Sequence, residues 1–246
     1  RRNAAERELA ASERRHRLLF EAAGLGTILA GLDGCILDAN PAACRILRRS
    51  RSELQDVPYP AFTHPDDLGR ERPLADALLK GRSESYSLEK RYLAPDGAVV
   101  WAHLTVTLAR DEVGEPEYAL AQVTDIGERK ALEEALRTSE ARFRRAFDEA
   151  PVAALLLDPE LNIQRTNAEL RRLSGLREAE LRRSTLRELT HPADYDPSSP
   201  ERLRREGALR GLLRRYRGAD GEWFWGRVYA SLVRTATGEP SEVLAM

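Results

Sequence analysis

Hydrophobic and polar residues alternate along five short segments in the first half of the chain, a pattern typical of half-buried β-strands. The dipeptides Asp33-Gly34 and Asp96-Gly97 each separate two of these segments and suit a tight hairpin turn. Helix-forming stretches occupy about 40–81, between the two hairpins. This order predicts an α+β domain, a five-stranded antiparallel sheet with short helices on one face. The expected strands are 27–32, 35–39, 85–93, 99–109 and 117–125.

The chain contains this unit twice. The stretch NPAACRILRRS begins at Asn40, and NAELRRLSGLR begins 127 residues later at Asn167 (167 − 40). Near the end of the unit the offset falls to 124, because PDGAVVW ends at Trp101 and ADGEWFW ends at Trp225. A single three-residue deletion in the second copy, between about 195 and 212, accounts for the change. The 246 residues therefore predict two domains of ordinary size in tandem.

Side-chain caps are expected at the helix starts of both copies. Asn40 and Asn167 each precede a helical stretch, where an Asn side chain accepts a hydrogen bond from a free backbone N–H. Pro41 fits the first helical position, which needs no N–H donor. Thr63 and Thr190 are expected to cap a further short helix in each copy.

Residues 126–150 are rich in Ala, Leu, Glu and Arg, which predicts one continuous helix between the domains. Apolar or small residues recur along it at spacings of four and three, the heptad pattern of a coiled coil, and the stretch 127 residues earlier has the same phase. We expect these helices to pair in a homodimer, with packing on the chain's own sheet as the alternative. The candidate residues of this seam are Leu9, His16, Leu19, Leu132, Leu136 and Phe143.

These elements predict an N-terminal signalling helix at 1–23, a first domain at 24–127, a linker helix at 128–150 and a second domain at 151–246. The second domain is expected to be truncated in its last strand, because the final SEVLAM matches only the first six residues of EYALAQVTDI. We therefore expect the natural protein to continue into a helix and an output domain.

Composition narrows the classes of function. Hydrophobic residues make up 42% of the chain, enough for buried cores, whereas 39 basic and 40 acidic residues leave a net charge of −1. This balance argues against a nucleic-acid-binding protein. Two cysteines, Cys35 and Cys44, are too few for a disulfide framework or a four-cysteine zinc site, and they fit the reducing cytoplasm. No apolar run reaches the roughly 18 residues of a membrane span.

Four features together resemble the PAS domains of bacterial signalling proteins: the Asn-led helices, HPDD and HPAD, the DG…W hairpins, and VTDIGERKALEEAL from Val123. The resemblance implies a sensor that relays a conformational change to a histidine kinase, a cyclic-di-GMP enzyme or a phosphatase. The alternatives are a ligand-free dimerisation scaffold and a redox or light sensor. The sequence has no nucleophile elbow, phosphate-binding glycine-rich loop or His-Glu-x-x-His motif, so no catalysis by this chain is expected.

The resemblance to PAS domains also implies where a cofactor would be held. Flavin photochemistry in this family needs a cysteine on a short helix, and the corresponding stretch AFTHPDDLG has none. A haem ligand would be a histidine on the longer helix, expected here at about 68–80 and 199–210, and neither range contains histidine. Haem and flavin are therefore not expected, and the ligand is either absent or an unknown small metabolite.

A pocket for such a metabolite is expected between the longer helix and the inner face of the second hairpin. A cation lies on the apolar side of a strand in each copy, between a leucine and a tyrosine. This cation could bind a carboxylate ligand; alternatively, it reaches water or pairs with a local Glu. The candidate ligand-binding residues are Leu88, Lys90 and Tyr92 in the first copy, and Leu212, Arg214 and Tyr216 in the second.

Overall fold

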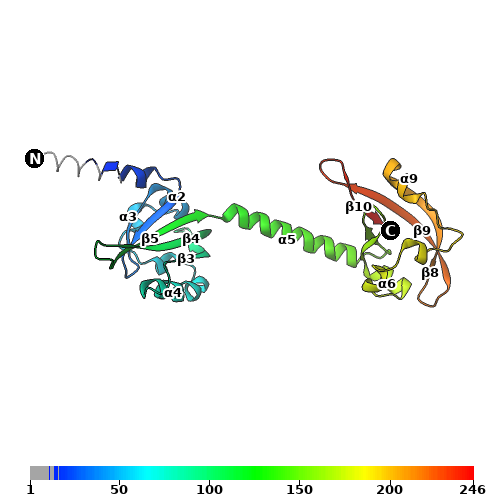
Figure 1. Ribbon diagram of the computed structural model, residues 1–246, viewed down its shortest axis with the longest axis horizontal. Helices are drawn as coiled ribbons and strands as arrows, with labels where there is room; N and C mark the ends of the chain where they lie inside the picture. The colour runs from blue at the N-terminus through cyan, green and yellow to red at the C-terminus, as the bar shows by residue number, and fades with distance from the viewer. Residues whose placement is uncertain (1–10, 12–13, 16) are drawn as a thin grey trace, which may run out of the picture. The chain divides into compact units, whose positions relative to one another are not determined.

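The computed structural model describes residues 11, 14–15 and 17–246. The chain divides between Ala135 and Leu136 into two compact units, and each unit contains one copy of the repeat. Each is described by itself (Figure 1).

The first unit contains five strands and a block of short helices between its two hairpins. Its elements are β1 (Gly26–Ala30), β2 (Ile36–Ala39), α2 (Pro41–Leu47), α3 (Arg51–Leu54), the 3-10 helix η1 (Tyr59–Phe62), α4 (Pro65–Leu79), β3 (Ser85–Leu93), β4 (Val99–Arg110) and β5 (Pro116–Asp125). Helix α5 (Gly127–Asp148) follows.

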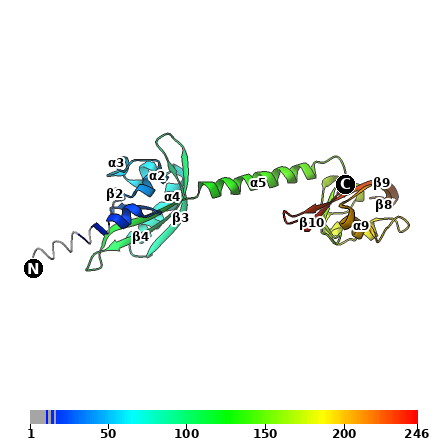
Figure 2. The ribbon, with the colours of Figure 1, turned by 90° about the horizontal axis from the view of Figure 1, so that it is seen from above.

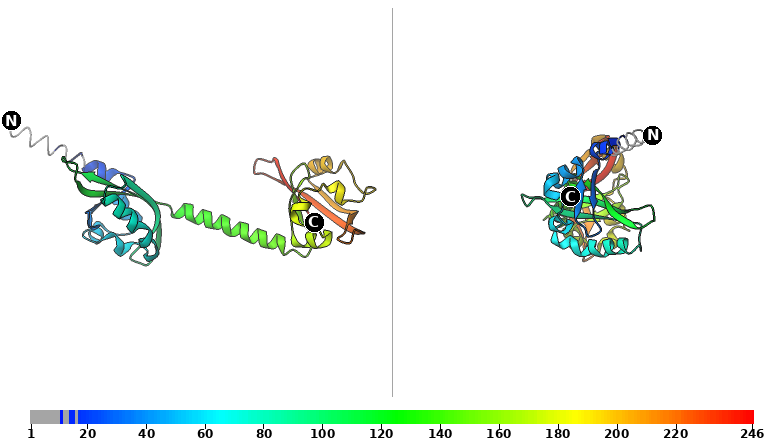
Figure 3. Two further views of the ribbon diagram at one scale, coloured as in Figure 1. Left: turned by 60° about the horizontal axis from the view of Figure 1, so that its bottom comes forward. Right: turned by 90° about the vertical axis from the view of Figure 1, so that its left-hand side faces the viewer.

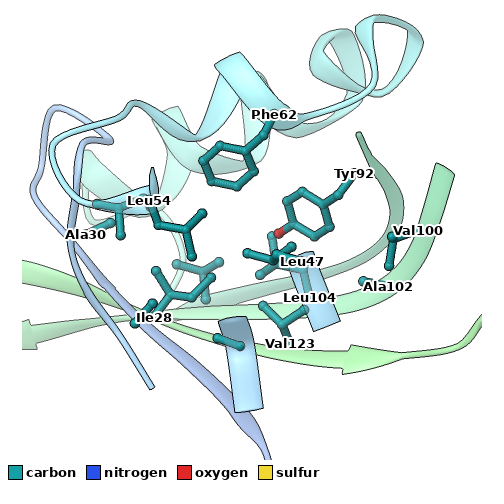
Figure 4. Close-up of a cluster of buried hydrophobic side chains, with 14 of the residues drawn as sticks. Ile28, Ala30, Leu47, Leu54, Phe62, Tyr92, Val100, Ala102, Leu104 and Val123 are labelled. Carbon is teal, nitrogen blue, oxygen red and sulfur yellow. The ribbon is translucent and has the colours of Figure 1, made fainter. Parts of the chain in front are cut away.

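The five strands form one antiparallel sheet in the order β2-β1-β5-β4-β3, and the helices lie on one of its faces (Figures 1 and 2). The main hydrophobic core lies between this face and the helices. Figure 4 shows Phe62 and Tyr92 together in this core, and their ring centroids are 5.7 Å apart. The sheet contributes strand residues to the same cluster, among them Ile28, Leu104 and Val123.

The second unit repeats this arrangement. Its elements are β6 (Leu155–Leu157), β7 (Ile163–Thr166), α6 (Ala168–Ser174), α7 (Glu178–Leu181), α8 (Leu186–Leu189), α9 (Ser199–Glu206), β8 (Ala208–Arg217), β9 (Trp223–Arg234) and β10 (Pro240–Ala245). The strand order is β7-β6-β10-β9-β8, and helix α9 packs against β8 and β9 (Figure 3). The predicted α+β class, with two five-stranded antiparallel sheets, is confirmed.

The two asparagines predicted as helix caps do more than cap. Asn40 is fully buried, and its side-chain oxygen accepts hydrogen bonds from Ala43 N at 2.8 Å and from Thr27 N at 2.9 Å. Its amide group donates to the carbonyls of Phe20 and Leu25. Each amide therefore joins a helix start to the first strand of its sheet, and Asn167 repeats the arrangement with Ala154, Leu170 and Val152.

The threonine caps were predicted wrongly. Helix α4 is capped by His64, whose Nδ1 accepts a hydrogen bond from Asp66 N, whereas Thr63 pairs with β3 at Tyr92 and is buried. In the second unit Thr190 is the C-cap of α8, and residues 191–195 form turns instead of a helix. The neighbouring histidine accepts the local backbone hydrogen bond in both units, which leaves the threonine hydroxyl free to face the interior.

The deletion in the second copy has two parts. Two positions are equivalent when their partners in the neighbouring strand are equivalent. By this criterion Leu209 corresponds to Tyr86, 123 residues earlier (209 − 86), whereas Leu212 corresponds to Leu88, 124 residues earlier (212 − 88). Strand β8 therefore contains a one-residue bulge, and four residues, not three, are missing before it. Gly211 lies in the bulge with a φ of 65°, a left-handed conformation that favours glycine. Helix α9 has 8 residues, against 15 in α4, and it is shorter because residues 192–198 are not helical.

We expect Asn40→Ala to destabilise the first unit, and Asn167→Ala the second, by about 2–3 kcal/mol each, because a cap and further buried hydrogen bonds are lost together. Amide hydrogen exchange in β1 and β6 measures each unit separately. Asn162→Ala, at an exposed asparagine of the β6–β7 turn, is the control and should change stability by less than about 0.5 kcal/mol. Equal effects of the buried and exposed substitutions would contradict the structural role of the two amides.

Candidate functional site

A cavity of about 530 Å³ lies in the first unit between the inner face of the sheet and the helices. Its walls come from β1, η1, α4 and the second hairpin, so residues far apart in sequence meet there. Most of the lining is aliphatic or aromatic, and the charged side chains Glu71 and Lys90 face each other within it. A mostly apolar cavity with few converging polar groups is the usual form of a small-molecule site.

Lys90 and Glu71 form a buried ion pair. The Lys90 Nζ donates to both carboxylate oxygens of Glu71, at 2.7 and 2.6 Å, and to Thr63 Oγ1 at 3.1 Å. The same Nζ lies 5.0 Å from the ring centroid of Tyr59 and 4.4 Å from that of Tyr92. The ammonium group thus has its three donors matched by three oxygens and lies against two aromatic rings.

The environment of this pair shifts several pKa values. Burial lowers the pKa of Lys90 from its usual value, and the Glu71 carboxylate opposes that shift. Burial raises the pKa of Tyr92 and of Tyr86 well above the usual value, and the charge of Glu71 adds to both shifts. The two tyrosines are therefore neutral at any physiological pH and can only hydrogen-bond.

Of the three candidates in the first copy, Lys90 and Tyr92 line the cavity, whereas Leu88 is buried in the core beside it. The pairing with a glutamate that the sequence left open is the arrangement observed, through Glu71. Sequence reasoning did not single out Glu71. The sequence shows only that Glu71 shares a helical face with Asp67 and Leu78, and the structure shows that this face is buried.

The second unit contains a cavity of about 630 Å³ in the corresponding place. All three candidates of the second copy, Leu212, Arg214 and Tyr216, line it. The Arg214 guanidinium donates to Ser199 Oγ at 2.8 Å, and Ser199 is the first residue of α9. In this cavity the cation therefore faces a hydroxyl where the first unit has a carboxylate.

The HPDD and HPAD stretches each contain an aspartate that hydrogen-bonds to the strand beside the cavity. Asp67 accepts hydrogen bonds from the backbone N, Nε and Nη2 of Arg91, and Asp194 accepts the same three from Arg215. These hydrogen bonds lower the pKa of both carboxyl groups, to about 2 for Asp194. Asp67 thus ties the first turn of α4 to the strand that carries Lys90, and Asp194 ties the segment before α9 to the strand that carries Arg214.

The histidines and cysteines of the described chain lie away from both cavities, and none of them is a lining residue. His64 and His191 accept backbone hydrogen bonds, and His103 is on the opposite face of β4 from its buried residues. Among residues 11, 14–15 and 17–246, no group of three metal-ligating side chains and no helix fit to cross a membrane is found.

The candidate seam residues divide into two groups. Leu9 and His16 lie outside the described residues. Of the others, Leu19, Leu132 and Leu136 are more than 60% exposed and Phe143 is 49% exposed, so in the single chain they are uncovered apolar side chains. Whether they pair with a second copy stays a prediction.

Replacing Glu71 with Gln should leave Lys90 buried without a counter-charge and destabilise the first unit by about 3–5 kcal/mol. The pKa of Lys90 would fall further below that of an unfolded lysine. Between these two pKa values the unfolded chain binds more protons, so the stability of E71Q should rise with pH from neutral toward about 10. Hydrogen exchange in β3 and β4 at several pH values measures this.

The double variant Glu71→Leu with Lys90→Met is the control, since it removes both charges while keeping similar side-chain volumes. It should recover most of the lost stability and show no such pH dependence. A single variant E71Q as stable as the unchanged protein would contradict the ion pair.

Comparison with known proteins agrees with this fold. The family model described as the PAS fold matches residues 14–126 and 141–246. The probable diguanylate cyclase DgcE of Escherichia coli (strain K12) is 37% identical over 131 residues, which are 53% of this chain and 12% of that protein. The sensor histidine kinase TmoS of Ectopseudomonas mendocina is 32% identical over 128 residues, 52% of this chain and 13% of that protein.

A solved PAS domain of a protein from Colwellia psychrerythraea is 18% identical, with a TM-score of 0.44, and the match covers 47% of this chain and 97% of that chain. The chain spans about an eighth of the length of the two curated relatives. The family match covers each unit in turn and nearly the whole sequence, and the chain therefore belongs to the PAS family as two PAS domains in tandem.

Proposed function

We propose that this chain is a sensory and signal-transduction module in which a small ligand binds a PAS cavity and changes the position of the helical linkers. Through these linkers the change reaches an output domain, and the chain performs no catalysis of its own. The observation that carries the proposal is the second hairpin. Its inner face lines the cavity, and its outer face holds the start of helix α5.

Adjacent residues of β3 serve the two faces, because side chains alternate along a strand. Lys90 points into the cavity, whereas Glu89 accepts hydrogen bonds on the outer face from Arg129 at 2.6 Å and forms an ion pair with Lys130 at 2.7 Å. The Lys130 Nζ also lies 5.3 Å from the ring centroid of Trp101. A ligand that displaces β3 would therefore move the groups that hold the first turn of α5.

The far end of α5 is also fixed by its own unit. Phe147 is buried against Ala154 and Leu156, and Asp148 pairs with Arg165 at 3.0 Å. The Arg165 guanidinium lies 5.2 Å from the ring centroid of Phe147. Since each end of the helix packs against a sheet, we place the relay in rotation or fraying of α5.

The nature of the output follows from the relatives. The two proteins reported above are a probable diguanylate cyclase and a sensor histidine kinase, and each is several times longer than the matched segment. We propose an effector of one of these kinds, or a phosphatase, C-terminal to the PAS domains. We place the module in a reducing compartment such as the cytoplasm, because both cysteines are free thiols.

A homodimer is the second part of the proposal. Leu132, Leu136 and Phe143 recur at spacings of four and seven, so they lie along one stripe of α5, and all are exposed. A second copy of the same helix would cover this stripe in a coiled coil. A ligand-free dimerisation scaffold would use the same stripe, and ligand binding distinguishes that function from sensing.

The purified protein should be colourless, without haem or flavin, because neither cavity is lined by a histidine or cysteine of the described chain. Native mass spectrometry should detect a small molecule that denaturation removes, or a panel of small molecules should raise the Tm. A Soret or flavin absorption band at one equivalent would refute the cofactor prediction. Failure of every small molecule to bind would favour the scaffold over the sensor.

Replacing Leu132 and Leu136 with Glu puts charges into the stripe, and sedimentation should then show a monomer in place of a dimer. Ala141→Glu is the control: Ala141 is also exposed, but the heptad spacing puts it on the opposite side of the helix, so the dimer should persist. A dimer unchanged by L132E/L136E would place the interface elsewhere, for instance on the sheets.

A further inference from the structure

The two cavities differ at one equivalent position. Lys90 pairs across the hairpin with Ala102, and Arg214 pairs with Gly226, each partner being 124 residues apart (214 − 90 and 226 − 102). The neighbouring bridge is also repeated, between a threonine and a tyrosine, as Thr63 with Tyr92 and Thr190 with Tyr216. The two cations therefore occupy the same site of the fold and can be compared directly.

Only the first cation has a carboxylate partner. Glu71 neutralises Lys90, whereas Arg214 has Ser199 as its hydrogen-bonding partner and no carboxylate within 4.0 Å among the described residues. A guanidinium has five N–H donors in a planar fork, so one hydroxyl leaves most of them available. At the offset of 127, Glu71 has Ser198 as its counterpart, and the neighbouring Ser199 contacts the cation.

The acidic side chains nearest to this site have hydrogen-bonding partners other than Arg214. Asp196 accepts hydrogen bonds from Ser198 and Ser199, and it pairs with Arg202 at 3.5 Å. Glu169, which lines the cavity, pairs with Arg172 at 2.5 Å. Asp196 is linked to Arg214 only through Ser199, so no carboxylate of the described residues pairs directly with the guanidinium.

The cavity around Arg214 is lined by more leucines than the first cavity, although Phe224, Trp225 and Tyr229 also line it. Tyr59 and Phe62 have Leu186 and Leu189 as counterparts at the offset of 127, and the bulge in β8 puts Leu209 in the place of Tyr86. Tyr59, one of the two rings that lie against Lys90, is thus replaced by a leucine. The leucines provide apolar contacts for a flexible hydrocarbon chain.

We infer that the second PAS domain binds a small aliphatic monocarboxylate, with its carboxylate on Arg214 and Ser199 and its hydrocarbon chain against the leucines. The inference rests on the proposed sensory function and specifies its ligand. The guanidinium fork matches a carboxylate with two parallel hydrogen bonds, which a neutral or cationic ligand cannot reproduce. The Lys90–Glu71 pair occupies the same place in the first domain, so one monocarboxylate binds per chain, in the second domain, and the first cavity is not assigned a carboxylate.

Isothermal titration of the whole chain with butanoate, hexanoate and octanoate tests the inference. We expect one site per chain and a Kd that falls about fourfold for each added methylene group, from about 0.8 kcal/mol per buried CH₂. 1-Hexanol is the control for the hydrocarbon alone and should bind at least tenfold more weakly than hexanoate.

Two substitutions test the site itself. Arg214→Gln should weaken hexanoate binding about 10- to 100-fold, because a charged pair of hydrogen bonds is lost, and Arg214→Lys should weaken it less. Ser199→Glu installs an internal carboxylate like that of Glu71 and should abolish binding without removing the cation. Ser199→Ala, which removes one hydroxyl without adding a charge, is its matched comparison and should weaken hexanoate binding only about 2- to 10-fold. Circular dichroism establishes that each variant is folded, and Ser199→Asp replaces Ser199→Glu if the larger side chain prevents folding.

The outcomes separate this inference from the proposed function. Hexanoate binding that is unaffected by Arg214→Gln, or equal binding of hexanoate and hexanol, overturns the carboxylate site. If carboxylates fail but other small molecules raise the Tm, the inference is wrong and the sensory function stands. If nothing binds to either domain, both are wrong.

Discussion

Each domain depends on one buried side-chain amide. Asn40 joins the start of α2 to β1 and to the chain entering the domain, and Asn167 does the same for α6 and β6. The strand is thereby fixed relative to the first helix, and the remaining helices follow over the same face of the sheet. Because no other neutral side chain of this size both accepts and donates with this geometry, the cavity beneath the helices depends on this residue.

The second domain has the same buried asparagine contacts as the first, but different side chains line its cavity. The first domain neutralises its cation internally, through Glu71 and two aromatic rings. The second has serines where the first has the glutamate, and it presents leucines and Arg214 to its cavity. Two copies of one fold therefore differ in whether the central charge is balanced by the protein.

Local patterns were sufficient to predict the strands, the two Asn caps and the inward direction of Lys90, because alternation and capping depend on neighbouring residues. The partner of Lys90 was not predictable in this way. Whether Glu71 reaches Lys90 depends on how α4 lies on the sheet, which tertiary packing decides. The prediction that Thr63 caps the helix was wrong for a similar reason. His64 accepts the hydrogen bond from the backbone N–H at the helix start, and the Thr63 hydroxyl instead accepts one from the buried ammonium of Lys90. The ligand-binding roles of the candidate residues are still predictions.

The bulge in β8 has a consequence for self-association through the sheets. Strand β8 is at the edge of its sheet, and Leu213 beside the bulge is 60% exposed, a combination that invites another strand to add to the edge. A regular incoming strand needs an unbroken series of N–H and C=O groups at constant spacing. The extra residue at Arg210 and Gly211 interrupts that series and twists the edge, so an incoming strand could form only short ladders on either side. The bulge therefore protects this edge against aggregation into continuous β-structure.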